Sequence, residues 1–126
     1  MCGIMGFINL KGSPVSQKLL EMMANAIAHR GPDGAGHWIE ENVGLAHRRL
    51  SILDTSNAGS QPMVSFCSRY VLSYNGVIYN FKELRAELKN LGYQFRSTGD
   101  TEVVLNSLAE WGTSALDRFN GMFALA

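Results

Sequence analysis

The chain starts with a short apolar run that lies only a few residues from the N-terminus. Residues 4–10 read Ile-Met-Gly-Phe-Ile-Asn-Leu. A short run with so few polar residues predicts a strand that is buried on both faces. A strand at this place fixes the start of the chain to a sheet. Cys2 is therefore expected to be held in place by the sheet.

Cys2 directly follows the initiator methionine. Aminopeptidases readily remove a methionine that precedes a residue as small as cysteine. The new first residue then carries a thiol and a free α-amine, which together are a nucleophile and a base for acyl transfer. Many chains have a cysteine at position 2 by chance, so a catalytic interpretation needs support from the rest of the sequence.

Composition narrows the classes of protein and partner. With 126 residues, of which 46% are hydrophobic, the chain fits one globular domain. Eleven basic and eleven acidic residues cancel, so neither nucleic acid nor membrane is expected as a partner. The chain lacks both an apolar run of about 20 residues and a secretory signal, and we expect a cytoplasmic protein. The two cysteines and three scattered histidines have no metal-ligand spacing, so we expect no metal.

The first half of the chain predicts a helix, two strands and a long loop. The apolar face of the helix, expected over 15–28, consists of Leu19, Met22, Met23, Ala26 and Ile27. Gly and Pro at 31–34 end it in a tight loop. Strands are expected at 36–40 and 43–48. The polar stretch 50–63 predicts a long surface loop, which in a compact domain tends to be functional.

The second half alternates strands and helices. Residues 70–74 predict a strand that ends at Asn75-Gly76. Asn80 is the expected N-cap of a helix over 81–91. A strand at 93–97, a helix opened by Asp100 or Thr101 and closed by Gly112, and a short helix at 113–119 follow. The apolar residues 121–126 predict a final strand. A strand that runs to the last residue lacks a further pairing partner, so we expect a fragment.

Five short motifs stand in order along the chain. They are Met1-Cys2-Gly3-Ile4, His29-Arg30-Gly31-Pro32-Asp33-Gly34, His47-Arg48-Arg49-Leu50-Ser51-Ile52, Asn75-Gly76-Val77-Ile78-Tyr79-Asn80 and Thr98-Gly99-Asp100-Thr101-Glu102. In this order and spacing the chain resembles, over its whole length, the glutamine amidotransferase domain of glutamine-hydrolysing asparagine synthetases, which are N-terminal-nucleophile hydrolases. Related amidotransferases that make glucosamine phosphate or phosphoribosylamine share the cysteine and the Asn-Gly pair but differ after His-Arg-Gly and around the substrate arginine.

This resemblance implies a fold. Members of this hydrolase class have an α+β fold, a four-layer αββα sandwich in which two antiparallel sheets lie face to face with helices outside. We expect residues 1–126 to form a single partial glutaminase domain, truncated at its C-terminus. The synthetase domain that activates aspartate with ATP would be absent from this chain.

The resemblance also implies catalytic roles. Cys2 would be the nucleophile, with its α-amine as the proton carrier. Asn75 and Gly76 would form the oxyanion hole, through the Asn carboxamide and the Gly backbone N–H. An alternative for Asn75-Gly76 is a type I′ hairpin turn, for which this pair is the strongest short signal. His29, Arg30 and Asp33 would order the loop beside the site.

Further residues would bind the two ends of glutamine. Arg49 would hold the α-carboxylate, since a guanidinium can meet a carboxylate with two parallel hydrogen bonds, and backbone groups of Leu50 and Ile52 would complete this contact. Without its motif, Arg49 would more often be part of a solvated surface pair. Asp100 would bind the α-ammonium, although an Asp before a helix is most often an N-cap, and one carboxylate can serve both purposes.

Val77 departs from the family pattern, which typically has Glu after the Asn-Gly pair. That Glu helps to bind the glutamine ammonium. Its loss is expected to weaken glutamine recognition by roughly 1.5–3 kcal/mol, the usual contribution of a charged hydrogen bond. The hypothesis is a raised requirement for glutamine with intact chemistry.

The resemblance implies L-glutamine and a C-terminal synthetase domain as partners, and it allows a homodimer. No cofactor is expected in this chain, because ATP and magnesium would bind in the synthetase domain. The implied function is hydrolysis of the glutamine amide to glutamate and ammonia, which serves asparagine synthesis. Two alternatives remain open: a non-catalytic remnant or docking domain of the same fold, and an amidotransferase whose acceptor is not aspartate.

Overall fold

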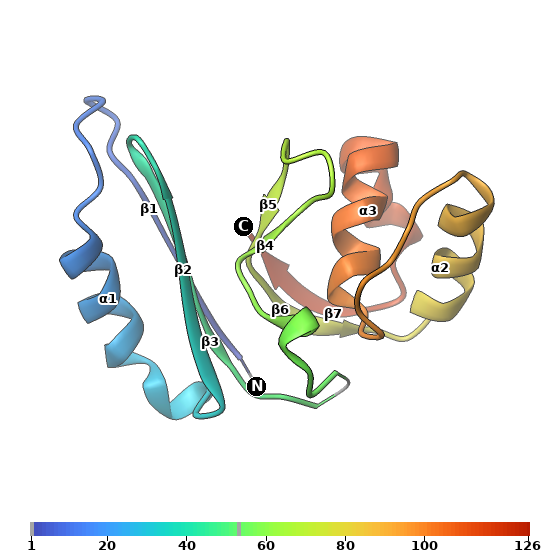
Figure 1. Ribbon diagram of the computed structural model, residues 1–126, viewed down its shortest axis with the longest axis horizontal. Helices are drawn as coiled ribbons and strands as arrows, with labels where there is room; N and C mark the ends of the chain where they lie inside the picture. The colour runs from blue at the N-terminus through green and yellow to red at the C-terminus, as the bar shows by residue number, and fades with distance from the viewer. Residues whose placement is uncertain (1, 53) are drawn as a thin grey trace.

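The secondary structure is arranged in four layers (Figure 1). The computed structural model describes residues 2–52 and 54–126. Helix α1 (Gln17–Ala26) covers one face of the first sheet, and helices α2 (Phe81–Asn90) and α3 (Thr101–Trp111) lie on the far side of the second sheet layer. This order of helix, sheet, sheet and helix confirms the predicted α+β αββα sandwich.

The first sheet has three antiparallel strands in the order β1-β3-β2. They are β1 (Gly3–Ile8), β2 (Gly34–Glu40) and β3 (Val43–Arg49). The second layer consists of two antiparallel pairs. Strand β4 (Met63–Val64) pairs with β5 (Val71–Leu72), and β6 (Tyr74–Ile78) pairs with β7 (Gly121–Leu125).

Short 3₁₀ turns complete the secondary structure of the described residues. They lie at Ala28–Arg30, Asn57–Gly59 and Gly112–Arg118. The last of these occupies the place of the predicted helix at 113–119. The turn at Asn57–Gly59 lies within the predicted long loop, which ends at strand β4.

Two buried hydrogen bonds join the two sheet layers. The hydroxyl of Ser73 donates to the carbonyl of Ala46 at 3.2 Å, and Nε2 of His47 lies 3.1 Å from the carbonyl of Tyr74. Both join strand β3 to the β5–β6 segment. The sequence predicted one strand over 70–74, but Ser73 interrupts it and pairs instead with Ala126 through two backbone hydrogen bonds.

Asn75 and Gly76 lie inside strand β6, so the prediction that they end a strand is wrong, and the hairpin alternative is also excluded. Their register partners on β7 are Ala124 and Phe123. A Cβ added at Gly76 would lie 2.5 Å from the carbonyl oxygen of Met122 and 2.7 Å from the Cα of Phe123. Glycine is therefore required by the close approach of β7.

The predicted strand over 93–97 is wrong. This segment is irregular, because side chains take up its backbone groups. The Glu102 carboxylate accepts from the amides of Arg96 and Ser97, and the Arg85 guanidinium donates to the carbonyls of Ser97 and Gly99. Hydrogen bonds of this kind compete with a sheet ladder for the same groups.

Helix α1 presents a different face to the sheet from the one predicted. Leu20 is fully buried and Ala24 nearly so, whereas Met22 is 60% exposed. Gly44 explains this, because a Cβ there would lie 3.1 Å from the Leu20 side chain. The missing side chain leaves the space into which Leu20 packs, which selects the face that contains Leu20 and Ala24.

Strand β1 is less buried than the sequence predicted. Ile8 is 60% exposed, and Leu10, which the sequence placed in the same run but which lies beyond the end of β1, is 94% exposed. Strand β1 pairs with β3 and stands at the edge of its sheet within the described residues. The larger core lies between β5–β6 and helices α2 and α3. It contains Met63, Leu72, Tyr74, Ile78, Leu84, Leu88, Val103, Val104 and Leu105.

Candidate active site

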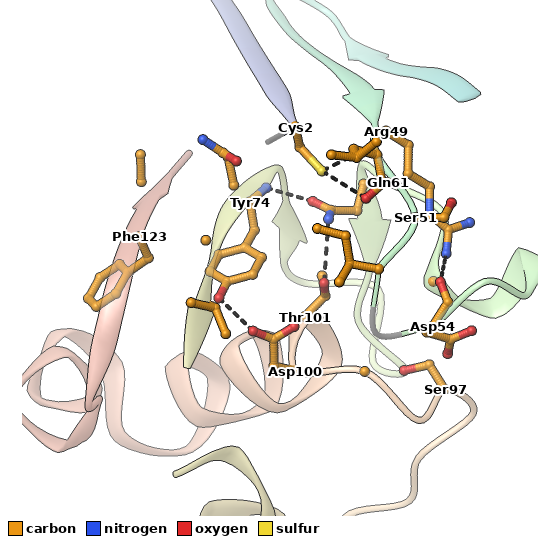
Figure 2. A pocket seen from close by; sticks show the side chains of 18 of the residues that line it. Cys2, Arg49, Ser51, Asp54, Gln61, Tyr74, Ser97, Asp100, Thr101 and Phe123 are labelled. Atoms are coloured by element: carbon orange, nitrogen blue, oxygen red, sulfur yellow. Dashed lines mark hydrogen bonds between the residues drawn. The ribbon is translucent and has the colours of Figure 1, made fainter. Parts of the chain in front are cut away.

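One pocket collects the predicted site residues from all parts of the chain. It has a volume of about 450 Å³, within the usual range of small-molecule sites. Cys2, Arg49, Asp100 and the Asn75–Val77 segment all line it, as do Leu50 and Ile52. Figure 2 shows Cys2, Arg49 and Asp100 around one hollow. All the residues that the sequence nominated are therefore brought together.

The sulfur of Cys2 is held by the chain segment that follows strand β3. The Leu50 amide lies 3.3 Å from Sγ, and Sγ lies 3.6 Å from the Leu50 carbonyl. The Arg30 side chain donates to the Cys2 carbonyl at 3.1 Å. The cysteine is thus fixed both by its sulfur and by its backbone, with its side chain at the pocket.

The loop after α1 supports this arrangement. Asp33 accepts from the amide of Ser51 at 2.8 Å, and its own amide donates to the carbonyl of Arg49. A Cβ at Gly31 would collide with the backbone of Arg48. The glycine thus permits a close approach between this loop and the end of strand β3, which carries Arg49.

Arg49 points its guanidinium along the pocket wall toward the Asp54–Ser56 turn. Its Nη2 donates to the carbonyl of Asp54, and its Nη1 donates to the carbonyl of Ser56 at 2.8 Å. A guanidinium has five N–H donors, so donors remain for a carboxylate in the pocket.

Asp100 is 5% exposed and stands at the N-cap position of α3. Its Oδ2 accepts from the hydroxyl of Tyr74 at 2.8 Å and from the amide of Ile78 at 3.0 Å. The carboxylate therefore turns toward strand β6 rather than capping the first turn of its own helix. Both donors bind the same oxygen, so Oδ1 accepts no hydrogen bond from the described residues, and Asp100 lines the pocket.

Tyr74 organises this region and was not nominated by the sequence. Burial, with the charge of Asp100 adding to it, raises the pKa of the Tyr74 hydroxyl far above its usual value, so it stays a donor. The Tyr74 amide donates to Oε1 of Gln61 at 2.6 Å, and Nε2 of Gln61 donates to the hydroxyl of Thr101 at 3.4 Å. The only signal in the sequence was the position of Tyr74, directly before Asn75-Gly76.

His47 lies on strand β3 and is 1% exposed. Burial lowers its pKa to about 4, against an opposing contribution from the hydrogen bond to the Tyr74 carbonyl. His47 is therefore neutral at pH 7. Its Nε2 carries the proton donated to Tyr74, and its Nδ1 has no hydrogen-bond partner among the described residues.

Two further observations concern ions and membranes. In residues 2–52 and 54–126, no three His, Cys, Asp or Glu side chains are grouped so that they could hold a metal ion. In the same part of the chain, no helix is long and apolar enough to cross a membrane.

The four-layer sandwich, with Cys2 at its pocket, is the fold and arrangement that the resemblance to glutamine amidotransferases implied. The structure of a glutamine phosphoribosylpyrophosphate amidotransferase from Bacillus subtilis has the same fold, with a TM-score of 0.78 at 19% identity. The match covers 97% of this chain and 34% of that one.

The model of the glutamine amidotransferase domain family matches residues 1–126, and the chain belongs to this family. It is 40% identical to asparagine synthetase [glutamine-hydrolyzing] 3 of Bacillus subtilis (strain 168), with 100% of this chain and 21% of that protein covered. It is 44% identical to asparagine synthetase B [glutamine-hydrolyzing] of Escherichia coli (strain K12), with 100% and 23% covered. These relatives confirm the resemblance, and the chain spans about a fifth of their length.

Proposed function

We propose that this domain hydrolyses the side-chain amide of L-glutamine to glutamate and ammonia. The observation that carries the proposal is that the Cys2 side chain opens onto the same pocket as Arg49, Asp100 and the Asn75-Gly76 pair. A nucleophile, an oxyanion-binding pair and one charged group for each end of an amino acid thus share one cavity.

The first step needs the free α-amine of Cys2, and so removal of Met1, which lies outside the described residues. The amine, directly or through one water, takes the thiol proton, and Sγ forms a bond to the amide carbon. The amide oxygen becomes an oxyanion. The carboxamide of Asn75 and the backbone N–H of Gly76 donate hydrogen bonds to it.

The tetrahedral intermediate then collapses. The carbon–nitrogen bond breaks, the α-ammonium of Cys2 returns its proton to the nitrogen, and ammonia leaves. The product on the enzyme is a thioester of Cys2. A water molecule, deprotonated by the α-amine, attacks the carbonyl carbon of this thioester. The carbon–sulfur bond then breaks, glutamate leaves, and the α-ammonium returns the proton to the sulfur, which restores the thiol.

Substrate recognition uses both ends of glutamine. Arg49 binds the α-carboxylate, with backbone groups of Leu50 and Ile52 beside it, and Asp100 binds the α-ammonium. The Leu50 amide also faces the Cys2 sulfur. Val77 contributes an apolar surface to the same pocket.

We further propose that the ammonia serves asparagine synthesis from aspartate in a larger cytoplasmic protein. The names and lengths of the relatives support this. ATP and magnesium would bind in the synthetase domain of that protein, and this domain would use no cofactor of its own. Formation of a homodimer is a prediction that sedimentation of the full-length protein tests.

A second candidate is a non-catalytic domain of the same fold. Val77 favours it, because this position supplies no charge to the pocket. In such a protein the pocket would persist for docking or regulation, and Cys2 would have no role in turnover.

One experiment separates the two candidates. The full-length protein is exposed to a diazoketone analogue of glutamine, and the adduct is located by peptide mass spectrometry. An active amidotransferase is labelled once, at a methionine-free Cys2, and a Cys2→Ala variant is not labelled. If the analogue leaves Cys2 unmodified while iodoacetamide reaches it, the catalytic proposal is wrong and the second candidate gains support.

A further inference from the structure

Asp54 joins two segments that both line the pocket, its own turn and the segment before helix α3. Its Oδ2 accepts from the amide of Thr98 at 2.9 Å and from the Thr98 hydroxyl at 3.3 Å. Its Oδ1 accepts from the amide and the hydroxyl of Ser56, at 2.8 and 2.6 Å. One carboxylate thus makes four hydrogen bonds, two within its own turn and two to a segment 44 residues away.

The turn that Asp54 stabilises also holds Arg49. The two carbonyl groups that accept from the Arg49 guanidinium belong to Asp54 and Ser56. The direction of the guanidinium therefore depends on the shape of this turn. A Cβ at Gly59 would lie 2.5 Å from Nη2 of Arg49, so the loop closes tightly around the guanidinium.

The segment at the other end of the contact leads directly to Asp100. Only Gly99 separates Thr98 from Asp100, and the Arg85 guanidinium donates to the carbonyls of Ser97 and Gly99. A Cβ at Gly99 would lie 3.3 Å from the Cβ of Asp54. A short, firmly bonded path thus runs from Asp54 to the residue that faces the ammonium end of the pocket.

The hydrogen bonds to Ser56 and Thr98 occupy both oxygens of the Asp54 carboxylate. The hydrogen bond from the Ser56 hydroxyl, followed by that from the Thr98 amide, lowers the pKa of Asp54 to about 2, so it is ionised at neutral pH. Both of its oxygens already accept two hydrogen bonds. Asp54 therefore contacts other protein groups rather than the substrate. The carboxylate oxygen available to bind the substrate ammonium belongs to Asp100.

We propose that Asp54 is a positioning residue that sets the distance between Arg49 and Asp100 and so fits the pocket to the carboxylate and ammonium groups on the α-carbon of an amino acid. This inference rests on the proposed function. It assigns Asp54 to substrate binding and leaves the chemistry at Cys2 unaffected. Substitution should therefore raise the Michaelis constant far more than it lowers kcat.

The variants are Asp54→Ala, which loses all four contacts, and Asp54→Asn, which keeps one oxygen for Ser56 but loses an acceptor for Thr98. The matched control is Glu87→Ala, which removes another carboxylate that accepts charged hydrogen bonds, from Arg118, on the outer surface of α2. All are made in the full-length protein. The measurements are kcat and KM for glutamine, calorimetric Kd values for L-glutamate and glutarate, and the rate of Cys2 alkylation by iodoacetamide.

For Asp54→Ala, KM and both Kd values should rise at least about tenfold, with kcat changed less than about threefold and alkylation unchanged. The KM and Kd values of Asp54→Asn should lie between those of Asp54→Ala and the wild type. Those of Glu87→Ala should equal the wild-type values. Glutarate has both carboxylates but no ammonium, so weaker glutarate binding reports on Arg49. An unchanged Kd for glutarate would mean that Asp54 does not position Arg49, and the inference would be wrong.

Other results would also overturn the positioning role of Asp54 or the proposed function. Unchanged Kd values, or a kcat loss as large as the KM change, overturn the positioning role. If Asp54→Ala does not fold, Asp54→Asn carries the comparison. A wild-type protein that binds L-glutamate without hydrolysing glutamine refutes the proposed function, while the Kd values still decide the role of Asp54. A wild-type protein that binds no ligand refutes both.

Discussion

The hydroxyl of Tyr74 and the carboxylate of Asp100 form a buried 2.8 Å hydrogen bond that joins strand β6 to the start of helix α3. Tyr74 directly precedes the Asn75-Gly76 pair, and Asp100 is the expected partner of the substrate ammonium. Strand β6, which carries the proposed oxyanion donors, is therefore bonded directly to the residue proposed to bind the substrate ammonium. This contact holds the two proposed parts of the site as one unit.

Tyr74→Phe tests this contact. The variant leaves the Asp100 carboxylate with the Ile78 amide as its remaining donor, in a buried position. We expect a loss of about 1–3 kcal/mol in the free energy of unfolding and a rise of about threefold to tenfold in the KM for glutamine. Urea unfolding and steady-state kinetics measure the two effects. Tyr79→Phe is the control, because Tyr79 is 58% exposed, and it should leave both quantities unchanged.

Val77→Glu tests the apolar position in the pocket. A carboxylate there would give the glutamine ammonium a second anionic partner beside Asp100. We expect the KM for glutamine to fall by about tenfold or more, since a charged hydrogen bond contributes roughly 1.5–3 kcal/mol. Val77→Gln introduces a side chain of similar size to Glu but without charge, so its KM for glutamine should fall much less. An unchanged Michaelis constant in Val77→Glu would mean that Val77 does not limit glutamine binding.

The residues proposed to contact substrate could be predicted from the sequence, and the residues that hold them could not. Cys2, Arg49 and Asp100 stand in motifs, and a motif is a short stretch of sequence that can be recognised without the fold. Gln61 and Asp54 act through partners 13 and 44 residues away. Nothing near them in the sequence marks these partners, and only the folded chain brings them together.

The same distinction holds for the fold. Alternating and helical patterns predicted most of the elements, and the resemblance to the amidotransferase family predicted the order of the layers. They failed at 93–97, where Tyr93 and Phe95 favour a strand but the side chains of Glu102 and Arg85 bind the backbone. They also failed at helix α1, because the packing of Leu20 depends on Gly44 of another element.

Gly76→Ala tests the need for close approach between β6 and β7. The new Cβ would meet the Met122 carbonyl and the Phe123 backbone, so the two strands must move apart. We expect a loss of about 1–3 kcal/mol in stability from overpacking, and a fall of about 100-fold in kcat because the oxyanion donors are displaced. Gly6→Ala is the control, because its Cβ would lie at an ordinary 3.4 Å from Leu45. Equal stability of the two variants would contradict this account.

His47 predicts how stability depends on pH. The pKa of its imidazole is about 4 in the folded protein and 6.5 in the unfolded chain, so the unfolded chain binds more protons between these values. Stability therefore falls as the pH drops through this window, by about 3 kcal/mol in all, since one pKa unit corresponds to about 1.4 kcal/mol. Urea unfolding at pH 7.5 and pH 4.5 measures this fall. His47→Gln keeps an N–H donor for the Tyr74 carbonyl but does not titrate, so its stability should depend less on pH than that of the wild type. Identical pH dependence in the two proteins would show that His47 is not the source.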